Sequence, residues 1–244
     1  MNSKRFDVMQ TIYHPGSERG SADHGWLKAS HSFSFAGFFN PDRMNFGALR
    51  VLNDDIIAPG KGFGTHPHDN MEIVTIPQSG IVEHKDSMGH VQQLLPGEVQ
   101  AMSAGSGILH SEYNGSATEP LKLFQLWVLP KKRNIEPHYD QRAFPETGRE
   151  DRFQFVASPN GIDDSLPINQ DAFFSLGDFH GGSEGVYDIQ MPPNGCYLFV
   201  IEGRVEIEGQ TLGSRDALGF WEAASIDLDF KEDSKLLCIE VPML

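Results

Sequence analysis

The chain has 244 residues, of which 39% are apolar, so it is long enough for one large β domain or two domains of ordinary size. Its 19 Lys and Arg residues against 34 Asp and Glu residues give a formal net charge of −15. Such a surface repels phosphate backbones and anionic lipid. We therefore expect no direct binding to nucleic acid or to membranes.

The two cysteines, Cys196 and Cys238, lack CxxC spacing. This argues against a disulfide scaffold and a thiolate metal site, and favours two buried, reduced thiols. No window approaches the roughly 18 apolar residues that span a bilayer, and the N-terminus lacks the apolar core of a secretory signal. We expect a soluble, cytoplasmic protein and a monomer.

Short runs rich in Val, Ile, Phe and Thr alternate with Gly, Pro, Asn and Asp turn signals, which predicts an all-β fold. Between residues 131 and 171, prolines punctuate a polar stretch that we predict to be an inter-domain connection. In chain order the predicted strands are His31–Phe35, Phe46–Leu52, Glu72–Ile76, Ile81–Lys85, Leu121–Leu129, Cys196–Ile201, Val205–Glu208 and Leu236–Val241.

The two halves of the sequence echo each other. Residues 79–83 read Ser-Gly-Ile-Val-Glu and residues 202–206 read Glu-Gly-Arg-Val-Glu, and each run follows an apolar strand. A duplicated β-sandwich or barrel with copies of about 100 residues fits typical domain size. We place the first domain at residues 1–137 and the second at residues 138–244.

Nine of the ten histidines precede residue 139. His66 and His68 are one residue apart, so in an extended strand both imidazoles point the same way, and Pro67 stiffens that geometry. The same parity places His110 and Glu112 on one face of a second segment. Two such pairs facing each other inside a barrel would offer three nitrogens and one oxygen to a single metal ion.

Imidazole and carboxylate ligands without thiolate suit Fe, Mn, Co, Ni, Cu or Zn, whereas Mg and Ca prefer oxygen ligands alone. Four protein ligands on an octahedral metal leave two positions open. An oxygenase needs such positions because substrate and dioxygen must both reach the metal, whereas a structural zinc site is usually closed. An open site is therefore a hypothesis at this point.

These motifs resemble the cupin superfamily. The run from GFGTHPH to Gly80 resembles the first cupin motif, although one residue more than usual precedes Gly80. The run MSAGSGILHSEYN resembles the second, although Ser103 stands where cupins often carry Pro. Together with HSFSF, RVLNDD and DSMG, these strings are similar to pirins, and most similar to bacterial pirin-like quercetin dioxygenases. The resemblance covers nearly the full chain and is dense up to about Pro137.

The resemblance implies a bicupin: two antiparallel β-barrel or jelly-roll cupin domains, with one metal in the N-terminal cupin and none in the C-terminal cupin. Pirins bind the metal through three His and one Glu, which fall here on His66, His68, His110 and Glu112. We expect one divalent transition metal, Fe(II) before Cu, Mn, Co, Ni or Zn. In many other cupins the counterpart of Glu72 is a metal ligand. Here we expect Glu72 either to support the structure or to contact a ligand residue without binding the metal.

The second copy lacks the histidine pair. Counted back from the repeated glycine, the positions of His68 and His66 correspond to Met191 and Ile189. His180, the one histidine of that half, has no HxH or HxE partner. We therefore predict that the C-terminal cupin serves as a packing partner for the first.

Aromatic residues are concentrated ahead of the first histidine of the HPH motif. We predict that most of them pack in the core and that some line the mouth of the site, where their faces suit a flat aromatic substrate. We also assign two polar side chains to the pocket: His31, which shares strand parity with Phe33 and Phe35, and Gln125, which lies on the apolar strand ending at Leu129. The predicted pocket residues are His31, Phe33, Phe35, Phe46, Phe63 and Gln125.

The resemblance implies dioxygenation of a flavonol such as quercetin, with a small polyphenol and dioxygen as the molecules bound. In this hypothesis a substrate hydroxyl binds the metal as an oxyanion, Glu112 takes its proton as the catalytic base, and dioxygen cleaves the heterocycle. The residues argue independently for something narrower. They indicate a Lewis-acid metal that lowers the pKa of a ligand beside a carboxylate able to accept a proton.

Two alternatives stay open. Pirins of higher organisms are linked to transcription factors through a redox-active iron, so this chain could be a redox-sensing regulator with a protein partner, and its negative charge suits a basic one. A cupin isomerase or sugar-binding module is the other. Turnover of a polyphenol with oxygen uptake favours the enzyme, whereas iron-dependent capture of a partner without turnover favours the regulator.

Overall fold

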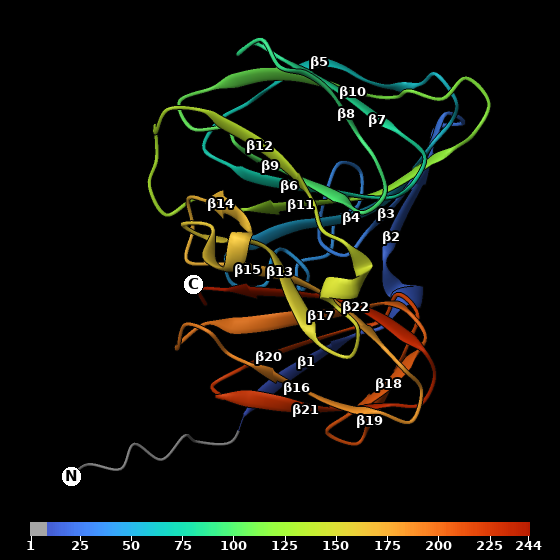
Figure 1. The fold of residues 1–244 in the computed structure, drawn as a ribbon, viewed down its shortest axis with the longest axis vertical. Helices are drawn as coiled ribbons and strands as arrows, with labels where there is room; N and C mark the ends of the chain where they lie inside the picture. Colours follow the sequence, from blue (N-terminus) through green and yellow to red (C-terminus); the bar gives the residue numbers. More distant parts are fainter. Residues whose placement is uncertain (1–8) are drawn as a thin grey trace.

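The computed structural model describes residues 9–244, and β-strands form nearly all of its regular structure. Four sheets are stacked in the order four, seven, seven and four strands (Figure 1). The all-β prediction is confirmed. In the described residues no helix is long and apolar enough to cross a membrane, and the helical segments are the 3-10 turns η1 (Gly16–Glu18), η2 (Glu146–Gly148) and η3 (Ile162–Asp164).

The first barrel consists of a seven-stranded and a four-stranded sheet. In spatial order the larger sheet contains β12 (His138–Ala143), β9 (Glu98–Ser103), β6 (Glu72–Ser79), β11 (Leu121–Val128), β4 (Leu49–Ile57), β3 (Leu27–His31) and β2 (Gly20–Asp23). The smaller sheet contains β5 (Gly62–His68), β10 (Ile108–Asn114), β7 (Val82–Asp86) and β8 (Val91–Leu94).

The second barrel repeats this plan. Its larger sheet contains β1 (Gln10–His14), β20 (Ala217–Trp221), β17 (Gly195–Glu202), β22 (Ser234–Val241), β15 (Phe173–Phe179), β13 (Phe153–Pro159) and β14 (Leu166–Ile168). Its smaller sheet contains β16 (Glu184–Asp188), β21 (Ser225–Phe230), β18 (Arg204–Ile207) and β19 (Gln210–Gly213).

The duplication predicted from the repeated glycines is confirmed by the strand order. β9, β6, β11 and β4 in the first barrel correspond to β20, β17, β22 and β15 in the second. Gly80 lies between β6 and β7 with φ 87°, and Gly203 lies between β17 and β18 with φ 92°. Both turns need a left-handed backbone, which explains why glycine recurs there.

The edge strands of the two large sheets are exchanged between the halves of the sequence. β12 pairs with β9 of the first barrel, although it follows residue 137, and β1 pairs with β20 of the second barrel. The boundary at residue 137 therefore does not coincide with the division between the sheets. For the strands other than β1 and β12, the division into two domains near residue 137 stays a prediction.

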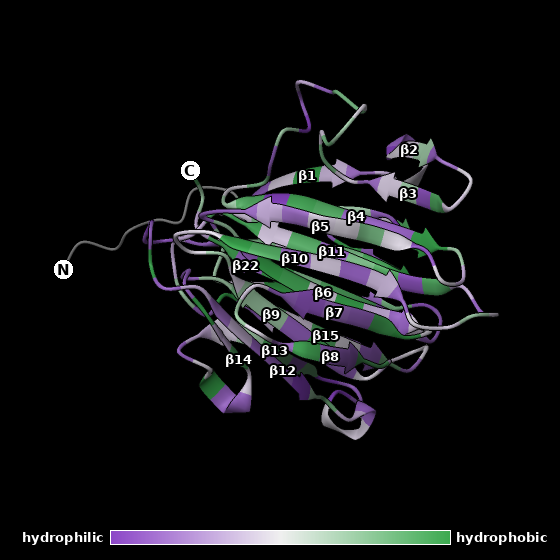
Figure 2. Cartoon of the chain, turned by 90° about the horizontal axis from the view of Figure 1, so that it is seen from above, coloured by the Kyte–Doolittle hydropathy of each residue, from purple (hydrophilic) through white to green (hydrophobic). Residues whose placement is uncertain are grey.

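Residues 131–171, predicted to be an inter-domain connection, contain the strands β12, β13 and β14, none of which was among the predicted strands. β12 is an exposed edge strand of polar sequence, so it lacks the apolar alternation that marks a strand (Figure 2). β14 contains Pro167, which an edge strand tolerates because one side of its backbone needs no partner.

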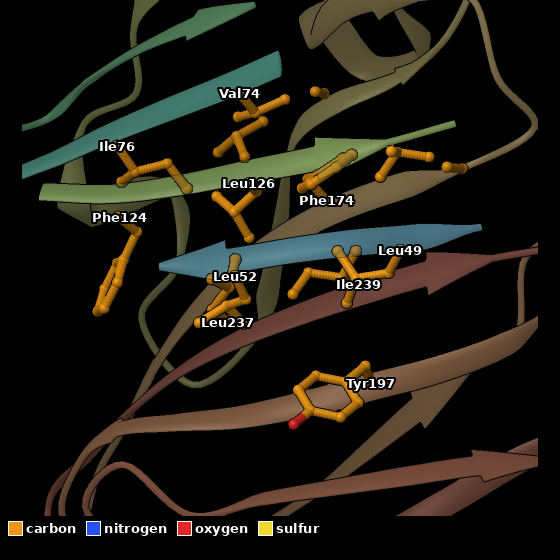
Figure 3. Packing of buried hydrophobic residues seen from close by; sticks show 14 of the residues in the cluster. Leu49, Leu52, Val74, Ile76, Phe124, Leu126, Phe174, Tyr197, Leu237 and Ile239 are labelled. Carbon is orange, nitrogen blue, oxygen red and sulfur yellow. The ribbon is translucent and has the colours of Figure 1, made fainter. Parts of the chain in front are cut away.

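The largest hydrophobic cluster lies between the two large sheets rather than inside either barrel (Figure 3). β11 shows how the sequence achieves this, because its alternate residues serve opposite faces. Phe124, Leu126 and Val128 join the cluster between the halves. Leu123 joins a cluster within the first barrel, and Gln125 lines a cavity there.

Ion pairs also cross between the halves. Asp54 on β4 accepts hydrogen bonds from Arg19 at 3.3 Å and from Arg215 at 2.7 Å. Arg215 belongs to the turn between β19 and β20, and its guanidinium lies 5.5 Å from the ring centroid of Phe124. The face of β4 that carries Asp54 is thus committed to holding the two barrels together.

We predict that Phe124→Ala lowers the free energy of unfolding by about 3–5 kcal/mol. Phe124 is fully buried and packs edge-on against Phe199 of the second barrel, with 5.6 Å between the ring centroids. Urea unfolding followed by circular dichroism measures the loss. Val91→Ala is the matched control, because Val91 is 67% exposed and its truncation should change stability by less than about 0.5 kcal/mol. Equal effects of the two substitutions would contradict the assigned core.

Candidate metal centre and its cavity

β5 and β10 bring the two histidine motifs side by side as neighbouring strands of one sheet, rather than facing each other across the barrel as expected from the sequence. In their antiparallel register His66 lies opposite His110, and Pro67 lies opposite Leu109. The strands approach closely at Gly62, where an added Cβ would lie 2.3 Å from the carbonyl oxygen of Glu112. Glycine at this position therefore permits the close pairing that sets the register.

The three imidazoles converge as the strand parity predicts. The ring centroids are 4.8 Å apart for His66 and His68, 4.5 Å for His66 and His110, and 4.8 Å for His68 and His110. One ligand nitrogen from each lies within 4.8 Å of the others. Three donors from two paired strands are therefore gathered on one wall of the first barrel.

The nitrogens of this cluster are free to bind a cation. Nδ1 of His66 lies 2.8 Å from the carbonyl oxygen of Gly64, so the tautomer that donates there leaves Nε2 with a lone pair. Nε2 of His68 and both ring nitrogens of His110 are buried without a hydrogen-bond partner. Buried polar atoms left unpaired cost free energy, and a bound metal would satisfy them. The donor set fits a divalent transition metal.

Burial keeps these imidazoles neutral. It lowers the pKa of His68 to about 4 and that of His110 to about 3, and the neighbouring histidines add to the effect. Neutral imidazole is the form that binds a metal. At neutral pH both rings are therefore already in the binding form.

Glu112 lies beside this cluster rather than within it. Its carboxylate falls within 4.8 Å of His110 and His84, in a second group that shares His110 with the first. β10 has a register irregularity between His110 and Glu112, so the carboxylate is displaced along the barrel wall relative to the three imidazoles. His110 therefore links the imidazole cluster to the carboxylate.

A band of polar side chains crosses the floor of the first barrel beneath Glu112. We call it the polar row. Its members occupy neighbouring positions in the strand register on β3, β4, β11, β6 and β9, all facing inward. They are His31, Asn53, Gln125, Thr75 and Gln100.

Three members of the polar row hold Glu112. Gln125 donates to Oε2 at 2.5 Å, and Thr75 and Gln100 donate to Oε1 at 3.2 and 3.4 Å. The Trp127 indole donates to the amide oxygen of Gln125 at 3.2 Å, which keeps its amide nitrogen directed at Glu112. The carboxylate is thus oriented by neutral donors and has no cation as partner within residues 9–244.

His84 is a candidate site residue that the sequence analysis missed. It is fully buried on β7, its Nε2 lies 3.2 Å from Asp86, and its Nδ1 has no hydrogen-bond partner. The ring of Tyr139 stacks on both His84 and His90, at centroid distances of 4.6 and 4.7 Å. The signal was present in the predicted strand Ile81–Lys85, where His84 shares inward parity with Val82.

Glu72 faces away from the histidines. Its carboxylate accepts hydrogen bonds from Ser103 at 2.5 Å and from the backbone N–H of Asn169 at 2.9 Å, and Asn169 belongs to the second half. Asn70, with φ 47°, breaks the extended chain between His68 and Glu72, so the even spacing does not preserve the side. The contacts agree with the structural role expected for Glu72.

A cavity of about 440 Å³ opens beside the imidazoles, a volume within the usual range for small-molecule sites. Two edge-on aromatic pairs flank it, Trp26 with Phe63 at 5.3 Å and Phe35 with Trp127 at 5.4 Å. Of the predicted pocket residues, those that line the cavity are His31, Phe35, Phe63 and Gln125.

Phe33 and Phe46 do not line this cavity, contrary to the expectation from the sequence. Both are buried in the cluster between the halves and contact Tyr197, at ring-centroid distances of 5.2 and 5.5 Å. β3 ends at His31, so the alternation that placed Phe33 beside His31 does not extend beyond the strand. Phe35, which forms an isolated bridge with Phe38 beyond the end of β3, is the phenylalanine of this segment that lines the cavity.

Several cavity residues carried weaker signals in the sequence. Trp127 shares strand parity with Gln125, and Asn53 and Asp55 alternate within the RVLNDD string. Trp26 directly precedes β3 in the sequence. Asn53 and Asp55 lie beyond the predicted strand Phe46–Leu52, whereas β4 extends to Ile57, so their inward parity did not follow from the prediction.

Two stacked β-barrels, one carrying a cluster of unpartnered imidazoles beside an aromatic cavity, define the bicupin class of metal-binding proteins. The family model described as Pirin matches residues 13–128, and the one described as Quercetinase C-terminal cupin domain matches residues 155–241. A quercetin 2,3-dioxygenase of Escherichia coli strain K12 is 43% identical over 226 residues, covering 93% of this chain and 96% of that protein. The chain belongs to the pirin family.

Further relatives agree with this assignment. A putative quercetin 2,3-dioxygenase of Zymomonas mobilis is 43% identical over 229 residues, covering 93% of this chain and 97% of that protein. The crystal structure of a bacterial pirin from Escherichia coli in complex with nickel(II) is 41% identical, with a TM-score of 0.91, and the match covers 96% of this chain and 100% of that chain. The bicupin fold expected from the sequence is confirmed.

We predict that His110→Gln flattens the loss of stability of the metal-free protein as the pH falls from 7 to 5. The folded pKa of His110 is about 3, below the unfolded value near 6.5, so only the unfolded chain takes up this proton in that range. Urea unfolding at several pH values gives the slope for each protein.

His180→Gln is the control for that comparison. Asp151 raises the pKa of this exposed histidine, so His180 contributes with the opposite sign and its removal should not flatten the slope. Parallel pH profiles for the unaltered chain and His110→Gln would show that the His110 ring is not held neutral by its surroundings.

Proposed function

We propose that this protein is a metal-dependent flavonol 2,3-dioxygenase. In the proposal one divalent transition metal, iron(II) in the native protein, is bound by His66, His68, His110 and Glu112. The substrates are a small polyphenol of the quercetin type and dioxygen.

One observation carries the proposal. Imidazole nitrogens without protein partners meet at the wall of a cavity whose sides are aromatic rings. An apolar cavity with a few convergent polar groups is the usual form of a small-molecule site, and a flat aromatic ligand can stack against such walls. The quercetin dioxygenase names of the relatives, and the nickel(II) complex of one of them, support the substrate class and the metal.

When bound, the metal supplies Lewis acidity and a position at which dioxygen can react. The three imidazoles would hold it at the wall of the cavity. The edge-on pairs Trp26 with Phe63 and Phe35 with Trp127 confine a planar ring system between them.

Glu112 is the proton acceptor of the proposed reaction. Thr75, Gln100 and Gln125 direct their donors at its two oxygens, which fixes the orientation of the carboxylate. A phenolic hydroxyl beside it can transfer its proton to Glu112. The substrate would thereby become an anion next to the three imidazoles.

We predict that His66→Ala abolishes both metal binding and flavonol turnover, because a ligand nitrogen is lost from the cluster. Elemental analysis of protein purified without added metal, together with oxygen uptake during quercetin consumption, measures both properties. His180→Ala is the matched control and should behave like the unaltered chain, since His180 is exposed in the second half. Wild-type protein that consumes no oxygen with any flavonol would contradict the proposed activity.

We predict that Glu112→Gln lowers kcat by about 10²–10⁴, the range typical of a lost general base. The amide keeps the size of the side chain but cannot accept the proton. Stopped-flow absorbance of quercetin with metal content measured in parallel separates loss of the base from loss of the metal. Full turnover at full metal content would show that Glu112 is not the base.

A further inference from the structure

Asp55 is a buried carboxylic acid on the wall of the cavity that the proposed reaction does not use. It lies on β4 between Ala29 of β3 and Leu123 of β11 in the sheet register, so its neighbours on the inner face are apolar. It is 4% exposed and lines the same cavity as His66 and His68. Asp55 is therefore the charged residue of an otherwise apolar stretch of the wall.

The carboxyl group of Asp55 lacks the partners that its neighbour has. Asp54, on the other face of β4, is paired with Arg19 and Arg215. Oδ1 of Asp55 has no hydrogen-bond partner within the described chain, and none of the ion pairs there includes Asp55. Burial, together with the charges of Asp54 and Glu112, raises its pKa to about 7.

A buried carboxyl group without a partner destabilises a folded protein, because its lost hydration is not replaced. Side chains on a strand alternate between its two faces. Leu52 and Asp54 on β4 face the second barrel, where they join the core and the ion pairs, so Asp55 must face the cavity. A group of this kind on a cavity wall is explained if the ligand of the cavity brings the missing partner.

Asp55 lies apart from the residues that hold Glu112. Asp55 is two residues along β4 from Asn53, which corresponds to about 7 Å of strand. Asn53 lies opposite Gln125, the residue that donates to Glu112. A ligand that reaches both Glu112 and Asp55 must therefore carry two separate polar groups, one for each end of this stretch of wall.

Resting on the function proposed above, we propose that Asp55 hydrogen-bonds a hydroxyl on the outer part of a flavonol, away from the group that binds the metal. Asp55 is then a specificity-determining residue that restricts the site to polyhydroxylated flavonols. A phenolic hydroxyl can donate to a carboxylate or accept from a carboxylic acid, so it suits Asp55 in either protonation state. Substrates without an outer hydroxyl leave the carboxyl group unpaired.

The test compares two substrates that differ only in outer hydroxyls. Quercetin carries them on both outer rings, whereas 3-hydroxyflavone keeps only the hydroxyl next to the carbonyl. The unaltered protein should prefer quercetin in kcat/KM, and Asp55→Ala should reduce that preference at least about tenfold. Asp55→Asn, which can still form one hydrogen bond, should retain an intermediate preference.

Ile57→Val is the matched control, because Ile57 is a buried inward residue two positions further along β4 that does not line the cavity. It should leave the preference unchanged. A purely structural role for Asp55 predicts equal losses for both substrates in Asp55→Ala, and that outcome would overturn the inference. So would an unaltered protein that shows no preference.

Binding measurements distinguish failure of this inference from failure of the proposed function. Trp26 and Trp127 line the cavity, so quenching of tryptophan fluorescence in metal-loaded protein under anaerobic conditions reports Kd for each flavonol. If the unaltered protein turns over neither compound, the proposed function fails and the ratio of Kd values decides about Asp55. A ratio that Asp55→Ala leaves unchanged overturns the inference, as does the absence of binding by either flavonol.

Discussion

The structure depends on large sheets that are buried on both faces. Each seven-stranded sheet contributes one set of alternate residues to the cluster between the halves and the other set to its own barrel. The strands that carry Gln125 and Asp55 are therefore fixed from behind by packing against the second barrel. Close packing of this kind resists displacement, which is what a site with several convergent groups requires.

The cavity is built by the meeting of two sheets with different roles. The small sheet supplies the imidazoles and Glu112, and the large sheet supplies the polar row that receives Glu112. Because Glu112 spans the gap, the position of the carboxylate depends on both sheets at once. The second barrel contributes differently, since its interior is filled by apolar side chains around Leu198 and Phe220.

Strand parity was enough to predict the convergence of His66, His68 and His110, because each motif lies within a single strand. Phe33 could not be placed in this way, since the strand that carries His31 ends before it. β12 was missed because an exposed edge strand needs no apolar face. Glu112 was placed on the correct face, but its contacts come from three strands of the opposite sheet. The positions of such partners follow from sheet register, which the local pattern does not contain.

The crossed edge strands bear on whether the barrels can exist separately. β1 belongs to the first half of the sequence but forms an edge of the large sheet of the second barrel. β12 belongs to the second half but forms an edge of the large sheet of the first barrel. A chain divided near residue 137 would leave β9 and β20 with open N–H and C=O groups, which invite pairing with other molecules. Neither half of the chain, taken alone, contains all the strands of its own large sheet.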